Sequence, residues 1–119
     1  MLFKKKILQN NAKTSKLLDK LPEIYIVTLW AKYTVLTFKF AGCNRQGIPM
    51  VYQYYDANGA ADEYHLIDVY HVTSAGTYSW SFDKDAAKHQ VEVMNEWLEK
   101  QFKKPTKKYK RQEKNEEIK

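Results

Sequence analysis

The sequence predicts an α+β fold in which a mostly antiparallel sheet, flanked by two helices, curls toward a barrel. Residues 23–82 consist of short β-branched and aromatic segments joined by tight turns. A short segment before them and a long segment after them carry apolar residues at helical spacing. A chain of 119 residues is expected to form one domain of this kind and not two.

The first helix is expected over residues 13–20, within KTSKLLDKLP. Thr14 or Ser15 can cap it, and Pro22 stops it, because the residue before a proline avoids the helical conformation. Its apolar stripe consists of Leu17, Leu18 and Leu21. Residues 1–10 are compatible with two structures, an extension of this helix or an edge strand.

Five strands are expected to follow. Residues 23–41 are long for one strand, so we expect a break near residues 31–33, with a central strand before it. After the break, one face is apolar and the other is more polar: Leu36, Phe38 and Phe40 against Tyr33, Val35, Thr37 and Lys39. The remaining strands are MVYQYYD, DEYHLIDVYHVT and TYSWSF, separated by the hairpin turn DANGA and the turn SAG.

A second, amphipathic helix is expected from Asp83, its N-cap, to Pro105, which ends it. Its apolar face carries Ala87, Val91, Met94, Leu98 and Phe102. Residues 1–104 then form the single domain, and residues 105–119, with little to bury, form a basic and mobile tail. The core is expected to contain Leu36, Phe38, Trp80, Phe82, Val91, Met94 and Leu98.

The net charge of +6 is concentrated at the two ends of the chain. Residues 1–20 carry +5 and residues 105–119 carry +3, whereas residues 21–104 carry −2. Basic ends attract polyanions, although lysine-rich ends can also serve solubility alone. The sequence contains no apolar run of membrane-spanning length and no secretory signal, and its single cysteine is Cys43. Together these features favour a cytoplasmic protein.

The segment EYHLIDVYHV places two histidines and two carboxylates within ten positions. In a strand, His65 and His71 share a face but lie roughly 20 Å apart, so they cannot bind one metal ion. We expect each to be a hydrogen-bonded residue near a strand end. Cys43 near Arg45 is a single loop cysteine, and AGCNRQG lacks the spacing of a phosphate-binding loop. The sequence therefore indicates neither an enzyme nor a cofactor or metal site.

Binding of single-stranded nucleic acid is the function that the composition favours, because bases stack on tyrosine rings while lysine and arginine contact phosphates. The candidates from the sheet and its loop are Tyr33, Lys39, Arg45, Gln53 and Tyr55. The candidates near the C-terminus are Lys103, Lys104, Lys107, Lys108, Lys110 and Arg111. Two alternatives remain open: these tyrosines pack inside the protein, or the exposed aromatic residues anchor a protein partner, as in a small inhibitor of a host or plasmid protein.

A short helix, about five strands including the DANGA hairpin, and a closing amphipathic helix resemble the order of elements in PUA-type β-pseudobarrels. The opening MLFKKKILQNNAKTSKLLDKLPEIYIV and the basic ends are similar to PrgU-type proteins, small cytoplasmic regulators on pheromone-inducible conjugative plasmids of Gram-positive bacteria. The resemblance covers residues 1 to about 104 and rests on length and element order rather than on a motif. It implies a non-enzymatic RNA-binding regulator that limits expression of plasmid surface and transfer genes post-transcriptionally.

Overall fold

The structure, a computed structural model, describes the backbone of residues 5–112 and the side chains of residues 5–102. Its centre is a six-stranded antiparallel sheet in the order β1-β5-β4-β3-β2-β6. The strands are β1 (Ile7–Gln9), β2 (Glu23–Leu29), β3 (Tyr33–Cys43), β4 (Pro49–Tyr55), β5 (Glu63–Asp68) and β6 (Ser79–Ser81). The helices are α1 (Ala12–Asp19), α2 (Lys84–Gln112) and the short 3-10 helix η1 (Ala57–Gly59). The predicted α+β fold with a largely antiparallel sheet is therefore confirmed.

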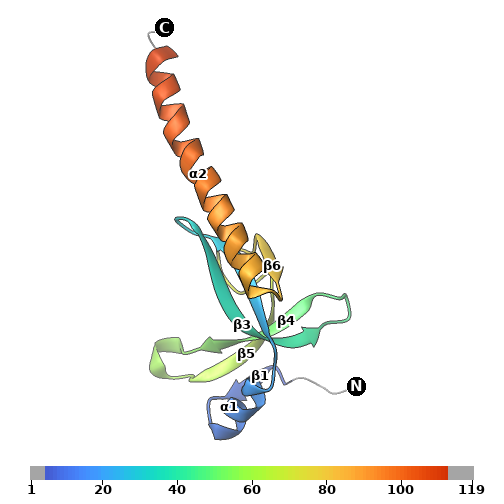
Figure 1. The fold of residues 1–119 in the computed structure, drawn as a ribbon. Coiled ribbons are helices and arrows are strands. Elements are labelled where there is room, and N and C mark those ends of the chain that lie inside the picture. The colour runs from blue at the N-terminus through green and yellow to red at the C-terminus, as the bar shows by residue number, and fades with distance from the viewer. Residues whose placement is uncertain (1–4, 113–119) are drawn as a thin grey trace.

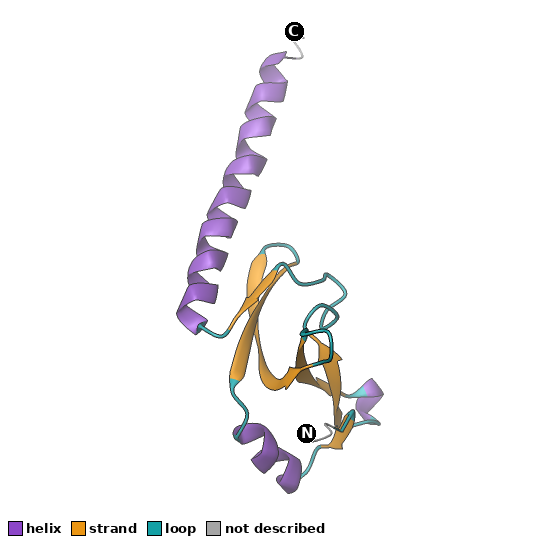
Figure 2. Ribbon diagram, turned by 90° about the vertical axis from the view of Figure 1, so that its right-hand side faces the viewer, coloured by secondary structure: helices purple, strands orange, loops and turns teal. Residues whose placement is uncertain are grey.

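The sheet is bent but open. Its two edges are the three-residue strands β1 and β6, which do not pair with each other in the described part of the chain. The register between β3 and β4 shifts between Phe40 and Cys43, which marks a β-bulge, and bulges bend and twist a sheet. Figure 2 shows the resulting curvature of the strands. A closed barrel is not formed, so the PUA-like pseudobarrel stays a prediction.

Both α-helices pack on the same face of the sheet, which we call the helix face. Leu18 of α1 packs against Leu8 of β1 and Tyr52 of β4. At the other end, Ala87 of α2 packs against Tyr25 and Val27 of β2. Figure 1 shows the two helices at opposite ends of the sheet, α2 along β2 and β3 and α1 below β1 and β5. The strand surface between the helices is therefore left accessible.

The opposite face, which we call the inner face, holds the main hydrophobic core. Ile24, Ile26, Val51 and Val69 are completely buried there. The chain that follows β5 turns back over this face, and the hydroxyl of Thr28 fixes it by donating to the Gly76 carbonyl at 2.6 Å. The segment that follows β5 thus covers the inner face of the curved sheet, whereas the two α-helices cover parts of the helix face.

Two local predictions near the N-terminus are resolved by hydrogen bonds. The N-cap of α1 is Asn11, whose Oδ1 accepts from the Thr14 amide at 2.9 Å, so the predicted caps Thr14 and Ser15 are wrong. Asparagine is as good an N-cap as serine or threonine, and it stands three residues earlier. Residues 7–9 form the edge strand β1, the second of the two structures considered for the N-terminus.

Strand β5 ends at Asp68, five residues before the predicted end at Thr73. Asp68 itself ends the strand: its Oδ1 accepts from the Tyr70 amide at 2.9 Å, and its carbonyl accepts from the His71 amide at 3.1 Å. An aspartate that binds the backbone two residues ahead closes a turn. Between β4 and β5 the predicted turn is present, with positive φ at Asn58 and Gly59.

The predicted core is only partly confirmed. Trp80 and Phe38 are partly buried and pack against the inner-face core, and Leu36 is also partly buried. Phe82 lies just after β6 and is 51% exposed, so its assignment to the core is wrong. Its ring still contacts Phe40 and Trp80 edge-on, with centroids 4.9 and 5.7 Å away. The remaining three, Val91, Met94 and Leu98, are partly buried against the helix face.

Helix α2 begins as predicted, because Asp83 Oδ1 accepts from the amides of Asp85 and Ala86. It does not end at Pro105 but continues to Gln112, so that prediction is wrong. A proline removes one helical hydrogen bond, and the lysine, arginine and glutamine residues that follow it are good helix formers. Of the predicted tail, residues 113–119 lie outside the described residues, and the domain boundary at residue 104 stays a prediction. None of the described helices is long and apolar enough to cross a membrane.

Candidate functional site

An open pocket of about 280 Å³ lies on the helix face, in the strand surface between α1 and α2. Strands β2, β3, β4 and β5 all contribute to it. We call it the tyrosine pocket, and its lining residues are Glu23, Thr37, Phe38, Lys39, Tyr52, Tyr54 and Tyr64. Its volume is close to the lower end of small-molecule sites, about 300–1,000 Å³. A single planar group, such as one nucleobase, therefore matches its size.

Strand register brings these side chains together. Lys39 of β3 pairs with Tyr52 of β4, and Tyr54 of β4 pairs with Tyr64 of β5. Paired residues point to the same face, and so do residues two apart in one strand. The lysine and the three tyrosines therefore form one contiguous group on the helix face.

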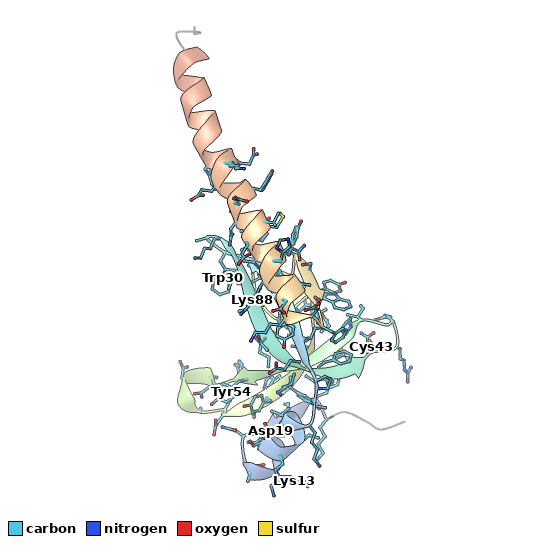
Figure 3. The ribbon with its side chains drawn as sticks, viewed as in Figure 1. Lys13, Asp19, Trp30, Cys43, Tyr54 and Lys88 are labelled. Carbon is cyan, nitrogen blue, oxygen red and sulfur yellow. The ribbon has the colours of Figure 1, made fainter. Side chains whose placement is uncertain are left out.

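Tyr54 and Tyr64 form the aromatic rim of the pocket. Their rings meet edge to face, with centroids 5.3 Å apart and planes at 64°. Tyr54 is 46% exposed, so much of its ring is accessible. Figure 3 shows Tyr54 toward one end of the sheet, with Cys43 toward the other. An exposed ring held by a neighbouring ring is suited to stacking with a planar ligand.

A hydrogen bond fixes the position of Tyr54. Its hydroxyl donates to Asp62 Oδ1 at 2.5 Å, and Asn10 Nδ2 donates to the same oxygen at 3.0 Å. The bond to Asp62, with some desolvation, raises the pKa of Tyr54 to about 12. The same bond, supported by Asn10, lowers the pKa of Asp62. Tyr54 is therefore held neutral, and β1, β4 and β5 are joined beside the pocket.

Tyr52 forms the floor of the pocket. It is only 5% exposed, and burial raises the pKa of its hydroxyl. That hydroxyl donates to the Lys5 carbonyl at 2.9 Å. The basic N-terminal segment therefore passes directly beside the pocket floor.

Among the described side chains, the pocket is lined by one cation and one carboxylate. Lys39 Nζ lies 3.8 Å from Glu23 Oε2, and it donates to the Leu21 carbonyl at 3.5 Å. Glu23 Oε1 accepts from the Tyr25 hydroxyl at 2.8 Å, and this bond raises the pKa of Tyr25. The contact of Lys39 with Leu21 places the end of α1 at the pocket rim. The exposed side of α1 carries three lysines: Lys13, Lys16 and Lys20.

The predicted site residues do not gather in one place. Among the candidates whose side chains the structure describes, only Lys39 lines the pocket. Tyr33 is buried beneath α2, where its backbone amide donates to Asn95 Oδ1 at 2.6 Å, so it cannot act as a stacking platform. Arg45 is exposed in the β3–β4 loop, roughly 20 Å along β4 from Tyr55.

Gln53 and Tyr55 lie on the inner face, opposite Lys39, and the bulge between Phe40 and Cys43 is the reason. Cys43 pairs with Pro49, and that register, continued without interruption, would pair Lys39 with Gln53. The bulge shifts the register by one residue, so Lys39 pairs with Tyr52 instead. A shift of one residue exchanges the two faces of a strand. Sequence reasoning therefore missed Tyr52, Tyr54 and Tyr64, which alternation alone could have found once the register was known.

The two histidines are hydrogen-bonded, as predicted. His65 Nε2 lies 2.6 Å from Glu63 Oε2, and the Tyr55 ring covers it at 4.6 Å. His71 Nδ1 lies 2.8 Å from Asp68 Oδ1, but in the turn after β5 rather than in the strand. Among the described residues, no group of three or more potential ligands is placed to bind a metal ion.

The C-terminal candidates lie beyond the described side chains, although α2 continues through their backbone as far as Gln112. These are Lys103, Lys104, Lys107, Lys108, Lys110 and Arg111. Comparisons with protein-family models, curated proteins and solved structures found no match to this chain. The resemblance to PrgU-type and PUA-like proteins accordingly stays a hypothesis, and the site is interpreted from its own chemistry.

Proposed function

We propose that this protein binds single-stranded RNA on the helix face, with one unpaired base in the tyrosine pocket. The observation that carries the proposal is the position of an open, tyrosine-lined pocket between two lysine-bearing helices. Base stacking on aromatic side chains and phosphate contact by lysines are the two components of single-strand binding.

The pocket offers a base each type of contact it needs. Tyr54 and Tyr64 supply ring surface for stacking. Glu23 supplies a carboxylate acceptor for an exocyclic amino group, and Lys39 supplies a donor beside it. A double helix presents its bases only at their edges, so an open pocket of this kind favours unpaired nucleotides.

The arrangement of charge supports the same proposal. The basic residues at the two ends of the sequence include the lysines of α1, which packs on the helix face, and those of the second half of α2, which extends from that face past the end of the sheet. The slightly acidic middle of the sequence, residues 21–104, forms strands β2 to β6 and the first half of α2. On one side of a bound base the RNA would meet the lysines of α1, and a strand that extends along α2 on the other side would reach the positive charge of its second half.

The wider role in this proposal is a non-enzymatic, cytoplasmic regulator that limits expression of conjugative-plasmid surface and transfer genes after transcription, on a PUA-like fold. The bent antiparallel sheet is compatible with that fold. The competing proposal is a protein-interaction module. Two exposed tryptophans favour it, Trp30 at 64% and Trp97 at 51%, because exposed tryptophans often anchor protein interfaces.

Titration of labelled single-stranded, hairpin and duplex RNA at two salt concentrations tests the proposal. We expect the single strand and the hairpin loop to bind best, and the logarithm of affinity to fall linearly with the logarithm of salt concentration. Lys39→Gln should weaken binding without unfolding the protein, since this side chain is partly exposed. Absence of binding to every RNA at low salt would refute the proposal and favour the protein-interaction module.

A further inference from the structure

Helix α2 has two halves of nearly equal length. The first half, residues 84–98, lies against the sheet through Ala87, Val91, Met94 and Leu98. The second half, residues 99–112, extends past the end of the sheet (Figure 1). At 1.5 Å per residue, the halves are about 22 and 21 Å long.

The charge of α2 reverses between Glu99 and Lys100, one residue past the boundary between these halves. Residues 84–99 contain four carboxylates and two lysines, a net charge of −2. Residues 100–112 contain six lysines, one arginine and no carboxylate, a net charge of +7. A helix with such a pattern is complementary to itself when a second copy runs in the opposite direction.

The charges also follow one line along the helix. Asp85, Glu92, Glu96 and Glu99 follow one another at intervals of seven, four and three residues, on the side away from the sheet, and all are exposed. The same spacing continues through positions 103, 107 and 110, which are lysines. Among the described side chains, Glu92 and Glu96 form no ion pair, and both are exposed.

We propose that α2 pairs with α2 of a second copy of this chain in antiparallel orientation, forming a twofold-symmetric dimer. With the twofold axis between residues 99 and 100, Glu96 faces Lys103 of the second copy and Glu92 faces its Lys107. The second half of each helix then lies along the outer side of the first half of the other. A twofold interface uses the same patch on both copies, so every such pair occurs twice.

Exposed apolar side chains next to the charged line add to this interface. Val93 is 46% exposed and Trp97 is 51% exposed, and both lie on the flank of α2 beside the carboxylates. A helix of another protein could cover them, but it would have to reproduce both the basic residues and their spacing. The second half of α2 already has both. Because charge supplies much of the attraction, we expect the dimer to weaken as salt rises.

A charge-swap experiment tests this proposal, with sedimentation velocity of the full chain across concentrations at low and high salt, without RNA. One variant carries Glu92→Lys and Glu96→Lys, and another carries Lys103→Glu and Lys107→Glu. Each variant alone should dimerise at least about tenfold more weakly than the wild type, because like charges meet twice. Mixed in equal amounts, the two variants should associate as a heterodimer, because all the opposite-charge pairs are restored.

A control variant with Asp19→Lys and Asp56→Lys makes the same change in net charge as the Glu92→Lys and Glu96→Lys variant, at exposed positions away from α2, and it should dimerise like the wild type at matched ionic strength. A wild type that stays monomeric at high concentration and low salt would overturn the proposal. So would a dimer that both swapped variants leave intact, or a mixture that does not associate. None of these outcomes depends on RNA binding, so the dimer and the proposed function are tested separately.

Discussion

Replacing Tyr54 by alanine removes the most accessible ring of the tyrosine pocket and should weaken binding of single-stranded RNA by about 5- to 30-fold. This range is the lower part of the effect of losing one stacked base on an aromatic ring. The lower part applies because Tyr64 already covers one side of the Tyr54 ring, leaving part of it for a base. Fluorescence anisotropy with a labelled single strand measures the change.

Two variants make this measurement specific. Tyr54→Phe keeps the ring and loses only the hydroxyl that bonds to Asp62, so it should retain most of the affinity. Tyr70→Ala removes a ring that is 48% exposed, close to the 46% of Tyr54, but lies outside the pocket, so it should bind like the wild type. Equal losses for Tyr54→Ala and Tyr70→Ala, or no loss for either, would refute the assignment of the base site.

Three further results are expected. Ile26→Ala, at a completely buried inner-face position, should reduce the free energy of unfolding by about 2–5 kcal/mol in chemical denaturation, and Leu98→Ala should cost less because Leu98 is only partly buried. In phenolate absorbance titration, one tyrosine should ionise near pH 12 and disappear in Tyr54→Phe; its raised pKa stabilises the fold below pH 10, an effect lost as pH rises toward 12. Neutralising the cluster Lys107, Lys108, Lys110 and Arg111 should weaken the binding of all RNAs alike. In titrations at several salt concentrations, the slope of log affinity against log salt concentration should become shallower by roughly 0.7 per lost phosphate contact.

Local chemistry in the sequence predicted most of the elements. The helical spacing of Ala87, Val91, Met94 and Leu98 predicted the packed face of α2, and Asp83 predicted its start. Phe102, which was assigned to the same face, lies past the sheet contact and is 71% exposed. The alternation in residues 33–40 predicted which side chains share a face of β3. These features depend on residues close together in the chain, where spacing and capping carry the information.

The composition of the site depended on long-range register, which local patterns do not contain. A bulge between Phe40 and Cys43 decides whether Lys39 shares a face with Gln53 or with Tyr52. Gly42, which lies within the bulge at a φ of 90°, is a local signal for it, but it does not specify which residues pair on either side. Tyr33 was misassigned for a similar reason. Its exposure depends on whether α2 packs over it, and the polar Asn95 that holds it there is 62 residues away.

The sequence shows that positive charge is concentrated at the two ends of the chain, but it does not show where those ends lie in the fold. That α1 and α2 cover the same face depends on the strand order and register of the whole sheet, which decide which side chains face the helices. The continuation of α2 past Pro105 also depended on context, since a proline usually ends a helix.

Ultraviolet crosslinking of the wild-type protein to single-stranded RNA, followed by mass spectrometry of the modified peptides, tests the central claim most directly. We expect crosslinks at Tyr54 or Tyr64, and their loss when excess unlabelled single strand competes. Crosslinks confined to the inner face at Tyr55, or to Trp30 and Trp97, would contradict the tyrosine pocket as the RNA site.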